Sequence, residues 1–260
     1  MTDSGDGFNE TLEENFPGAV SKDSYLASTY QSLSAEGFSR DNTLPCVALC
    51  RDEIAGPLVR GVERYWGHTF SLVSLAGMVT AGRTGISAAM AHAPTFAGRQ
   101  HVVVYAMPHI AIAADGTIGQ VERSGLTGTS AACGALSLFR DGLLEGRVDI
   151  ETDRLDAEQS LLSHRLLTLI PYGDIPGLVE LTMLTAQAIE DDLRAIVADL
   201  LEIARSQDVS TPDHALFTGV QIHGPDATNY VWPKSAHIVI GGVERDLAHD
   251  GVATTPSSTP

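Results

Sequence analysis

The sequence predicts an α/β protein with a parallel-sheet core flanked by helices, a helical C-terminal half and two late strands. Two observations lead to this fold class. In the first half of the chain, short and continuously apolar segments alternate with helical patterns, which is typical of parallel strands covered on both faces. The second half shows apolar residues at three- and four-residue spacing before two further strand-like segments.

Three strands and three helices are expected in alternation in the first half. Each strand is short, apolar and bounded by polar or turn-forming residues. The helices are marked by prolines, small residues and a serine start. The expected strands are 44–49, 69–75 and 100–106. The expected helices are 56–66, a segment that follows the small-residue stretch from Gly77 and ends at Pro94, and one that begins at Ser130.

The second half predicts two helical segments and two strands. Helical periodicity covers 153–169 and 176–205, and the second segment carries an apolar stripe that includes Ile189 and Leu193. The expected strands are 215–223 and 237–242. Because both ends of the chain are polar, we expect a polar N-terminal arm over 1–35, one α/β domain over 36–245 and a flexible tail over 246–260.

Charge and composition exclude several classes of protein. Sixteen basic and 33 acidic residues give a formal charge of −17, which argues against nucleic acid and anionic membranes as partners. No apolar run approaches the roughly 20 residues that span a bilayer. The acidic N-terminal sequence has no secretory signal pattern, so a cytoplasmic location is expected. An odd number of cysteines indicates reduced thiols rather than a disulfide framework.

Soft and imidazole ligands occur at the expected strand ends. Cys50 ends the first strand, His109 follows the third strand, and Cys133 lies near the start of the next helix. Ligands in open α/β sheets bind beyond the carboxyl ends of the strands. Two thiolates and one imidazole suit Zn²⁺ and leave one position open. The spacing alone is weak evidence, and burial as ordinary core residues is the competing interpretation, which we prefer for Cys46.

Several blocks of sequence resemble the limiting-CO₂-inducible B/C protein family. They occur in order from about residue 35 to 240, so the similarity covers nearly the whole chain. The blocks are CRDE from Cys50, SLAGMVTAGRTGISAAMAHAP from Ser74, AMPHIAIAADGTIGQVERSG from Ala106, AACGAL from Ala131, LIPYGDIP from Leu169 and TGVQIHGPDATNYVWP from Thr218. The resemblance implies a divergent β-type carbonic anhydrase: a zinc protein with a parallel-sheet core that usually forms homodimers.

The resemblance also implies roles for individual residues. Cys50, His109 and Cys133 become the zinc ligands, and the activity becomes a lyase reaction, the reversible hydration of CO₂ to bicarbonate by zinc-bound hydroxide. Asp52 stands where β-type enzymes keep the Asp of an Asp–Arg pair, which gates or orients the metal water. The usual Cys-x-Asp-x-Arg pattern would place Arg at Ile54.

Other residues therefore have to supply the arginine. Arg51 and Arg83 are the candidates, and both are expected to be catalytic together with Asp52. His223, at the carboxyl end of a late strand, is a further residue that could reach the rim of the site.

Two other functions stay open. In one, Asp52 ligates the zinc and closes the site, which makes a non-catalytic zinc protein of inorganic-carbon handling. In the other, Cys50 and His109 form a nucleophilic hydrolase. We also expect a homodimer, because the small-residue stretch 76–93 and the helix 176–205 offer more packing surface than a monomer of this size needs.

Overall fold

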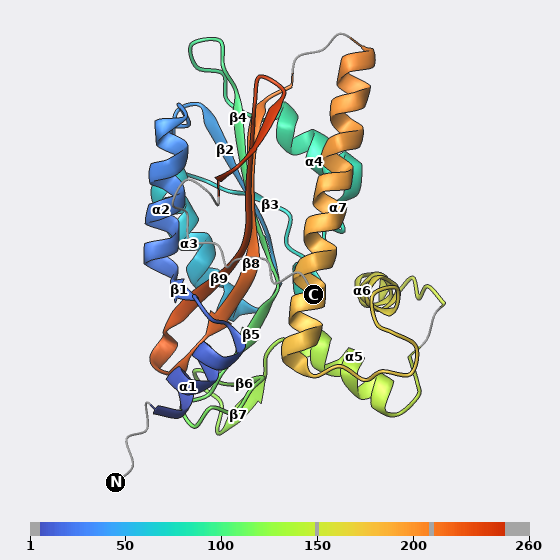
Figure 1. Cartoon of the computed structure of the whole chain (residues 1–260). Helices are drawn as coiled ribbons and strands as arrows, with labels where there is room; N and C mark the ends of the chain where they lie inside the picture. The colour runs from blue at the N-terminus through green and yellow to red at the C-terminus, as the bar shows by residue number, and fades with distance from the viewer. Residues whose placement is uncertain (1–5, 149–150, 208–210, 248–260) are drawn as a thin grey trace.

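A central mixed sheet organises the computed structural model, which describes residues 6–148, 151–207 and 211–247 (Figure 1). In this part of the chain the sheet has eight strands in the order β1-β9-β8-β4-β2-β3, with β10 beside β9 and β5 beside β8. The strands are β1 (Val20–Ser21), β2 (Thr43–Leu49), β3 (Phe70–Ser71), β4 (His101–Met107), β5 (His109–Ala111), β8 (Asp213–His223), β9 (Asn229–Ile240) and β10 (Val243–Asp246).

The predicted parallel core is confirmed. Strands β3, β2, β4 and β8 are parallel neighbours, and β9 adds antiparallel to β8. Two boundaries differ from the prediction. The last expected strand, 237–242, begins earlier, at Asn229, and turns back through β10. The second expected strand, 69–75, is regular only at Phe70–Ser71, although the backbone N–H of Ser74 still donates to Leu49 at 3.1 Å.

Helices cover both faces of the sheet, as Figure 1 shows. Two of them pack on one face, α2 (Lys22–Ala35) and α3 (Gly56–Trp66). The other face carries α4 (Gly82–Ala91), α5 (Gly134–Leu144), α6 (Ala157–Leu167) and α7 (Leu178–Ser206). Alternating residues of each strand therefore enter two separate cores, which is why the strand sequences are continuously apolar.

The N-terminal segment is more ordered than its composition predicted. Instead of a polar arm over 1–35, residues 6–35 form α1 (Asp6–Asn15), β1 and α2. Helix α1 buries Phe8 and Leu12 in a third apolar cluster with strand β8, and α2 buries Leu26 and Leu33. The few apolar residues lie on one face of each helix, so an average over the segment hides them. At the other end, Leu247 is buried, and 248–260 of the predicted tail lie outside the described residues.

The apolar stripe of the long helix is used inside the chain. Thr185, Ile189 and Leu193 of α7 are fully buried, and Ile189 and Leu193 join Ile86 and Ala89 of α4 in one core. This packing removes the stripe as a surface for a second subunit. In the described part of the chain, no helix combines the length and apolar character needed to cross a bilayer.

A hairpin replaces the predicted start of the helix at Ser130. Strand β7 (Thr129–Ala131) pairs antiparallel with β6 (Gln120–Glu122), and α5 begins only at Gly134. The hairpin lies at the end of the sheet where β5 also lies (Figure 1), so it brings its side chains to the carboxyl ends of the parallel strands.

Candidate metal centre

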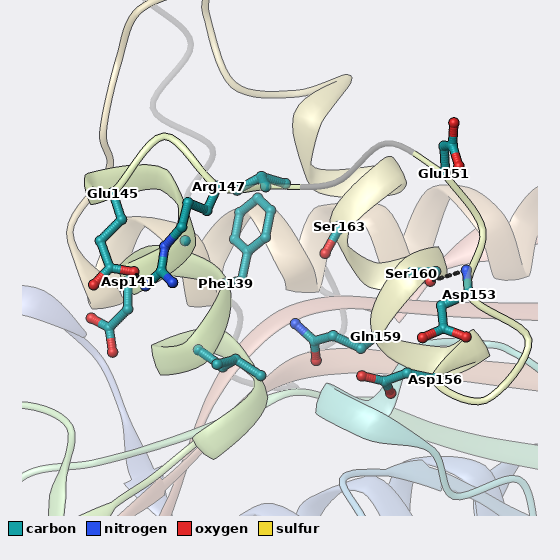
Figure 2. A pocket seen from close by; sticks show the side chains of 13 residues that line it. Phe139, Asp141, Glu145, Arg147, Glu151, Asp153, Asp156, Gln159, Ser160 and Ser163 are labelled. Carbon is teal, nitrogen blue, oxygen red and sulfur yellow. Dashed lines mark hydrogen bonds and ion pairs between the residues drawn. The ribbon is translucent and has the colours of Figure 1, made fainter.

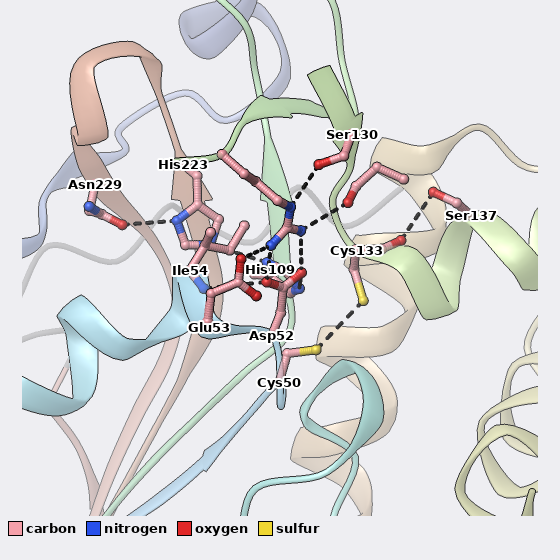
Figure 3. A network of polar contacts seen from close by, with 12 residues as sticks. Cys50, Asp52, Glu53, Ile54, His109, Ser130, Cys133, Ser137, His223 and Asn229 are labelled. Carbon is pink, nitrogen blue, oxygen red and sulfur yellow. Dashed lines mark hydrogen bonds and ion pairs between the residues drawn. The ribbon is translucent and has the colours of Figure 1, made fainter. Parts of the chain in front are cut away.

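Three buried side chains form a cluster that can hold a metal ion. One ligand atom from each of Cys50, His109 and Cys133 lies within 4.8 Å of the others. The two Sγ atoms are 3.7 Å apart and face each other in Figure 3. The exposed fractions of the three residues are 6%, 1% and 2%, so bulk water has little access to them. The structure brings together the three residues that the sequence predicted as metal ligands.

The sheet explains this convergence. Strands β2 and β4 pair in parallel up to Leu49 and Met107, so the chain segments that follow them leave the sheet at the same edge. Cys50 comes directly after β2, and His109 begins β5 after Pro108 interrupts the strand. Cys133 lies at the same edge but does not follow a strand of the central sheet. It is the N-cap residue of helix α5.

The donor atoms of the cluster suit a divalent metal ion. A hydrogen bond from the Cys133 thiol and, to a smaller extent, the neighbouring His109 lower the pKa of Cys50 to about 4, against the opposing effect of burial. The same hydrogen bond raises the pKa of Cys133, because one proton is shared between the two sulfurs. The Nε2 atom of His109 is buried and has no hydrogen-bond partner among the described residues. Two cysteine sulfurs, which bind metal as thiolates, and an imidazole nitrogen form a donor set that Zn²⁺ prefers.

Asp52 lies beside the cluster and is held by Arg123. The guanidinium donates from Nη1 to Oδ1 of Asp52 at 2.7 Å and from Nη2 to Oδ2 at 2.8 Å. It also donates to Glu53, to Ser130 Oγ at 2.7 Å and to the carbonyl of Ala131 at 3.1 Å. Burial alone would raise the pKa of Asp52, but the bonds from Arg123 hold that pKa well below its usual range. Oδ2 of Asp52 lies 3.8 Å from Nε2 of His109.

Arg123 corrects the expectation that Arg51 or Arg83 pairs with Asp52. Arg51 donates instead to Glu158, with its Nε 3.0 Å from the carboxylate. Arg83 donates to Asp199, with its Nε 2.8 Å from the carboxylate. Both arginines are more than half exposed. Arg123 lies 71 residues after Asp52 and comes next to β6, and only the VERSG segment of the family resemblance could have drawn attention to it.

His109 also has a partner on its side away from the thiols. Its Nδ1 lies 3.1 Å from Nε2 of His223, and Nδ1 of His223 lies 2.9 Å from Oδ1 of Asn229. Burial and the neighbouring His109 lower the pKa of His223 to about 3, so His223 is neutral. His223 is therefore in contact with the cluster through His109. Cys46 stays apart from it in the core, where burial raises the pKa of the thiol to about 12.

A separate cavity of about 380 Å³ lies between α5 and α6 (Figure 2). Its lining includes Asp141, Glu145, Asp153 and Asp156, together with Arg147. None of the cluster residues lines it. The backbone N–H of Asp153 donates to Ser160 Oγ at 3.0 Å, which ties the loop before α6 to that helix.

Comparison with known proteins identifies the family of this chain. Residues 19–240 match the family of limiting CO₂-inducible proteins B/C, beta carbonic anhydrases. The crystal structure of limiting CO₂-inducible protein LCIB superposes with a TM-score of 0.72 and 28% identity over 90% of this chain and 96% of that one. The crystal structure of its homologue PtLCIB4 has a TM-score of 0.77 and 24% identity over 92% and 98% of the two chains.

The curated proteins contain no match to this chain. Because the family match spans most of the sequence and includes every residue of the cluster, the chain belongs to the limiting CO₂-inducible B/C protein family of β-type carbonic anhydrases.

Proposed function

We propose that this protein is a zinc-dependent carbonic anhydrase that interconverts CO₂ and bicarbonate. The observation that carries the proposal is the buried Cys50–His109–Cys133 cluster beside a carboxylate whose two oxygens are both held by Arg123. Family membership supports the same reaction class. Cys50, His109 and Cys133 would hold the zinc ion. When bound, zinc makes hydroxide available at neutral pH by lowering the pKa of a coordinated water to about 7.

Asp52 and Arg123 have complementary roles in this proposal. The ionised carboxylate of Asp52 accepts a hydrogen bond from the attacking water and orients its lone pair toward CO₂. Arg123 binds both carboxylate oxygens, so Asp52 keeps its charge and its position beside His109. The low exposure of these two side chains, 12% for Asp52 and 14% for Arg123, limits competition from bulk water.

A second candidate is a non-catalytic zinc protein of inorganic-carbon handling. The specific observation in its favour is the distance of 3.8 Å between Asp52 Oδ2 and His109 Nε2. A carboxylate this close to the histidine of the cluster could serve as a fourth metal ligand. The site would then be closed to water. We place this state second because two hydrogen bonds from Arg123 hold Asp52 in its present orientation, while each oxygen keeps a lone pair that can accept a hydrogen bond from water.

The deciding experiment is stopped-flow CO₂ hydration across pH on protein of measured zinc content. We expect about one zinc ion per chain and hydration well above the buffer rate. Cys133→Ser should lose most of the metal, whereas Cys46→Ala, a buried thiol outside the cluster, should keep it. Full zinc occupancy without hydration would favour the closed site. Protein that binds no zinc would refute both zinc functions and leave the Cys50 hydrolase.

We also propose that the protein assembles as a homodimer in the cytoplasm. The support for assembly is a set of exposed apolar side chains on α5, α6 and the loops around them, which a second copy would cover. These are Leu138, Leu144, Leu155, Leu161, Tyr172 and Ile175.

A further inference from the structure

A chain of side-chain contacts leads from the candidate metal ligand His109 to a backbone carbonyl. His109 lies next to His223, and His223 lies next to Asn229, with donor–acceptor distances of 3.1 and 2.9 Å. Nδ2 of Asn229 then donates to the carbonyl oxygen of Ala227 at 2.8 Å. Figure 3 shows Asn229 and His223 on the side of His109 that faces away from the two sulfurs.

The carbonyl of Ala227 sets the direction of every bond in this chain. A carbonyl oxygen only accepts hydrogen bonds, so the side-chain nitrogen of Asn229 has to face it and Oδ1 has to face His223. Oδ1 also only accepts, so Nδ1 of His223 carries a proton. A neutral imidazole has one N–H, which leaves Nε2 of His223 as an acceptor for the Nδ1 proton of His109. In the neutral form of His109, the single proton then sits on Nδ1 and none sits on Nε2.

The free nitrogen is the one that faces the cluster. Nε2 of His109 is buried without a hydrogen-bond partner in the described part of the chain, as expected for a lone pair reserved for another atom. The turn that supplies the carbonyl is itself unusual. Asp226 and Ala227, between β8 and β9, have positive φ angles of 55° and 56°, a conformation that non-glycine residues rarely adopt.

We propose that His223 and Asn229 are positioning residues that fix the tautomer of His109, so that its Nε2 lone pair is always available to a metal ion. This inference rests on the proposed function only in taking His109 as a metal ligand. Reversing the direction of these hydrogen bonds would require Asn229 to turn its oxygen toward the Ala227 carbonyl, which places two acceptors together. The proton would then sit on Nε2 of His109, where it blocks ligation.

Zinc affinity is one test, measured by competition with a chelator. His223→Phe keeps the ring but removes both nitrogens, and Asn229→Leu keeps the side-chain size but removes the acceptor. Each should weaken zinc binding by about 10- to 100-fold, the usual effect of losing an outer partner of a metal-binding histidine. Asn229→Asp keeps an acceptor for His223 but sets a carboxylate oxygen against the Ala227 carbonyl, so it should recover only part of the affinity that Asn229→Leu loses. Thr228→Val is the matched control, because it removes a hydrogen bond of the same turn, from Thr228 Oγ1 to Pro225 at 2.7 Å, outside the chain of contacts.

The tautomer itself is the second test and needs neither metal nor activity. Two-bond ¹H–¹⁵N NMR spectra of the metal-free protein should show the proton of His109 on Nδ1, and Asn229→Leu should give a mixture of tautomers. A wild-type proton on Nε2, or unchanged zinc affinity in both His223→Phe and Asn229→Leu, would overturn the inference. Wild-type protein that shows the Nδ1 tautomer but no hydration would refute the carbonic anhydrase proposal and leave this one standing.

Discussion

Arg123 makes five hydrogen bonds with its five N–H groups, so replacing it tests the role of the Asp52–Arg123 pair most directly. Nε donates to Ser130, Nη1 donates to Asp52 and Glu53, and Nη2 donates to Asp52 and Ala131. Arg123→Met keeps the apolar part of the side chain and removes all five donors. It leaves the Asp52 carboxylate, 12% exposed, without its cationic partner.

Two effects of Arg123→Met should be measurable. Removing the arginine from this partly buried ion pair should cost about 1–3 kcal/mol of unfolding free energy, because the remaining carboxylate is left largely desolvated and without a partner. The hydration rate at equal zinc content should fall by about 10²–10³-fold, because the carboxylate that orients the water is no longer held. Arg123→Lys should recover only part of the rate, since an ammonium group cannot bind both oxygens of Asp52 in parallel.

Stopped-flow hydration and chemical denaturation would measure the two effects. The control is Arg99→Met, which removes a half-exposed arginine from its ion pair with Asp213, at the start of β8. It should cost no more than about 1 kcal/mol and leave the rate unchanged. Arg123→Met protein with wild-type zinc content and wild-type rate would refute the role of the pair. If Arg51→Met lost activity and Arg123→Met did not, Arg51 would be the functional partner of Asp52, as the sequence predicted.

Three further outcomes are expected. Asp52→Asn should keep zinc and lose hydration, since an amide cannot pair ionically with the arginine, whereas faster hydration in Asp52→Ala would show that the carboxylate closes the site. Burial raises the pKa of Glu190, but hydrogen bonds from His237 and Lys234 outweigh it and lower that pKa from 4.5 to about 2. A lowered carboxyl pKa stabilises the fold above pH 4.5 and loses this contribution as the pH falls toward 2, so the stability difference between wild type and Glu190→Gln should shrink over that range in acid denaturation. Light scattering at micromolar concentration should give twice the 27.5 kDa chain mass, and a purely monomeric species would contradict the homodimer.

The sequence by itself determined the parallel core and the three residues of the cluster. Both follow from local signals, because short apolar segments that alternate with helices form parallel strands, and parallel strands end at one edge of a sheet. Cys50 and His109 could therefore be placed together from their positions at the ends of two such strands. Cys133 was placed with them from its position near the start of the next helix, and the family resemblance in the blocks around all three residues supported the set.

Only the tertiary structure decided which groups support that cluster. Arg123 meets Asp52 across 71 residues because the β6–β7 hairpin folds back over the sheet edge, and nothing in the sequence between them encodes that distance. Asn229 and His223 act on His109 from two other strands. The same is true of helix α7, whose apolar stripe shows that the helix is covered but not what covers it. Periodicity depends on one segment alone, whereas the surface that covers a helix depends on how all segments pack together. Here the apolar stripe of α7 packs into the core of its own chain.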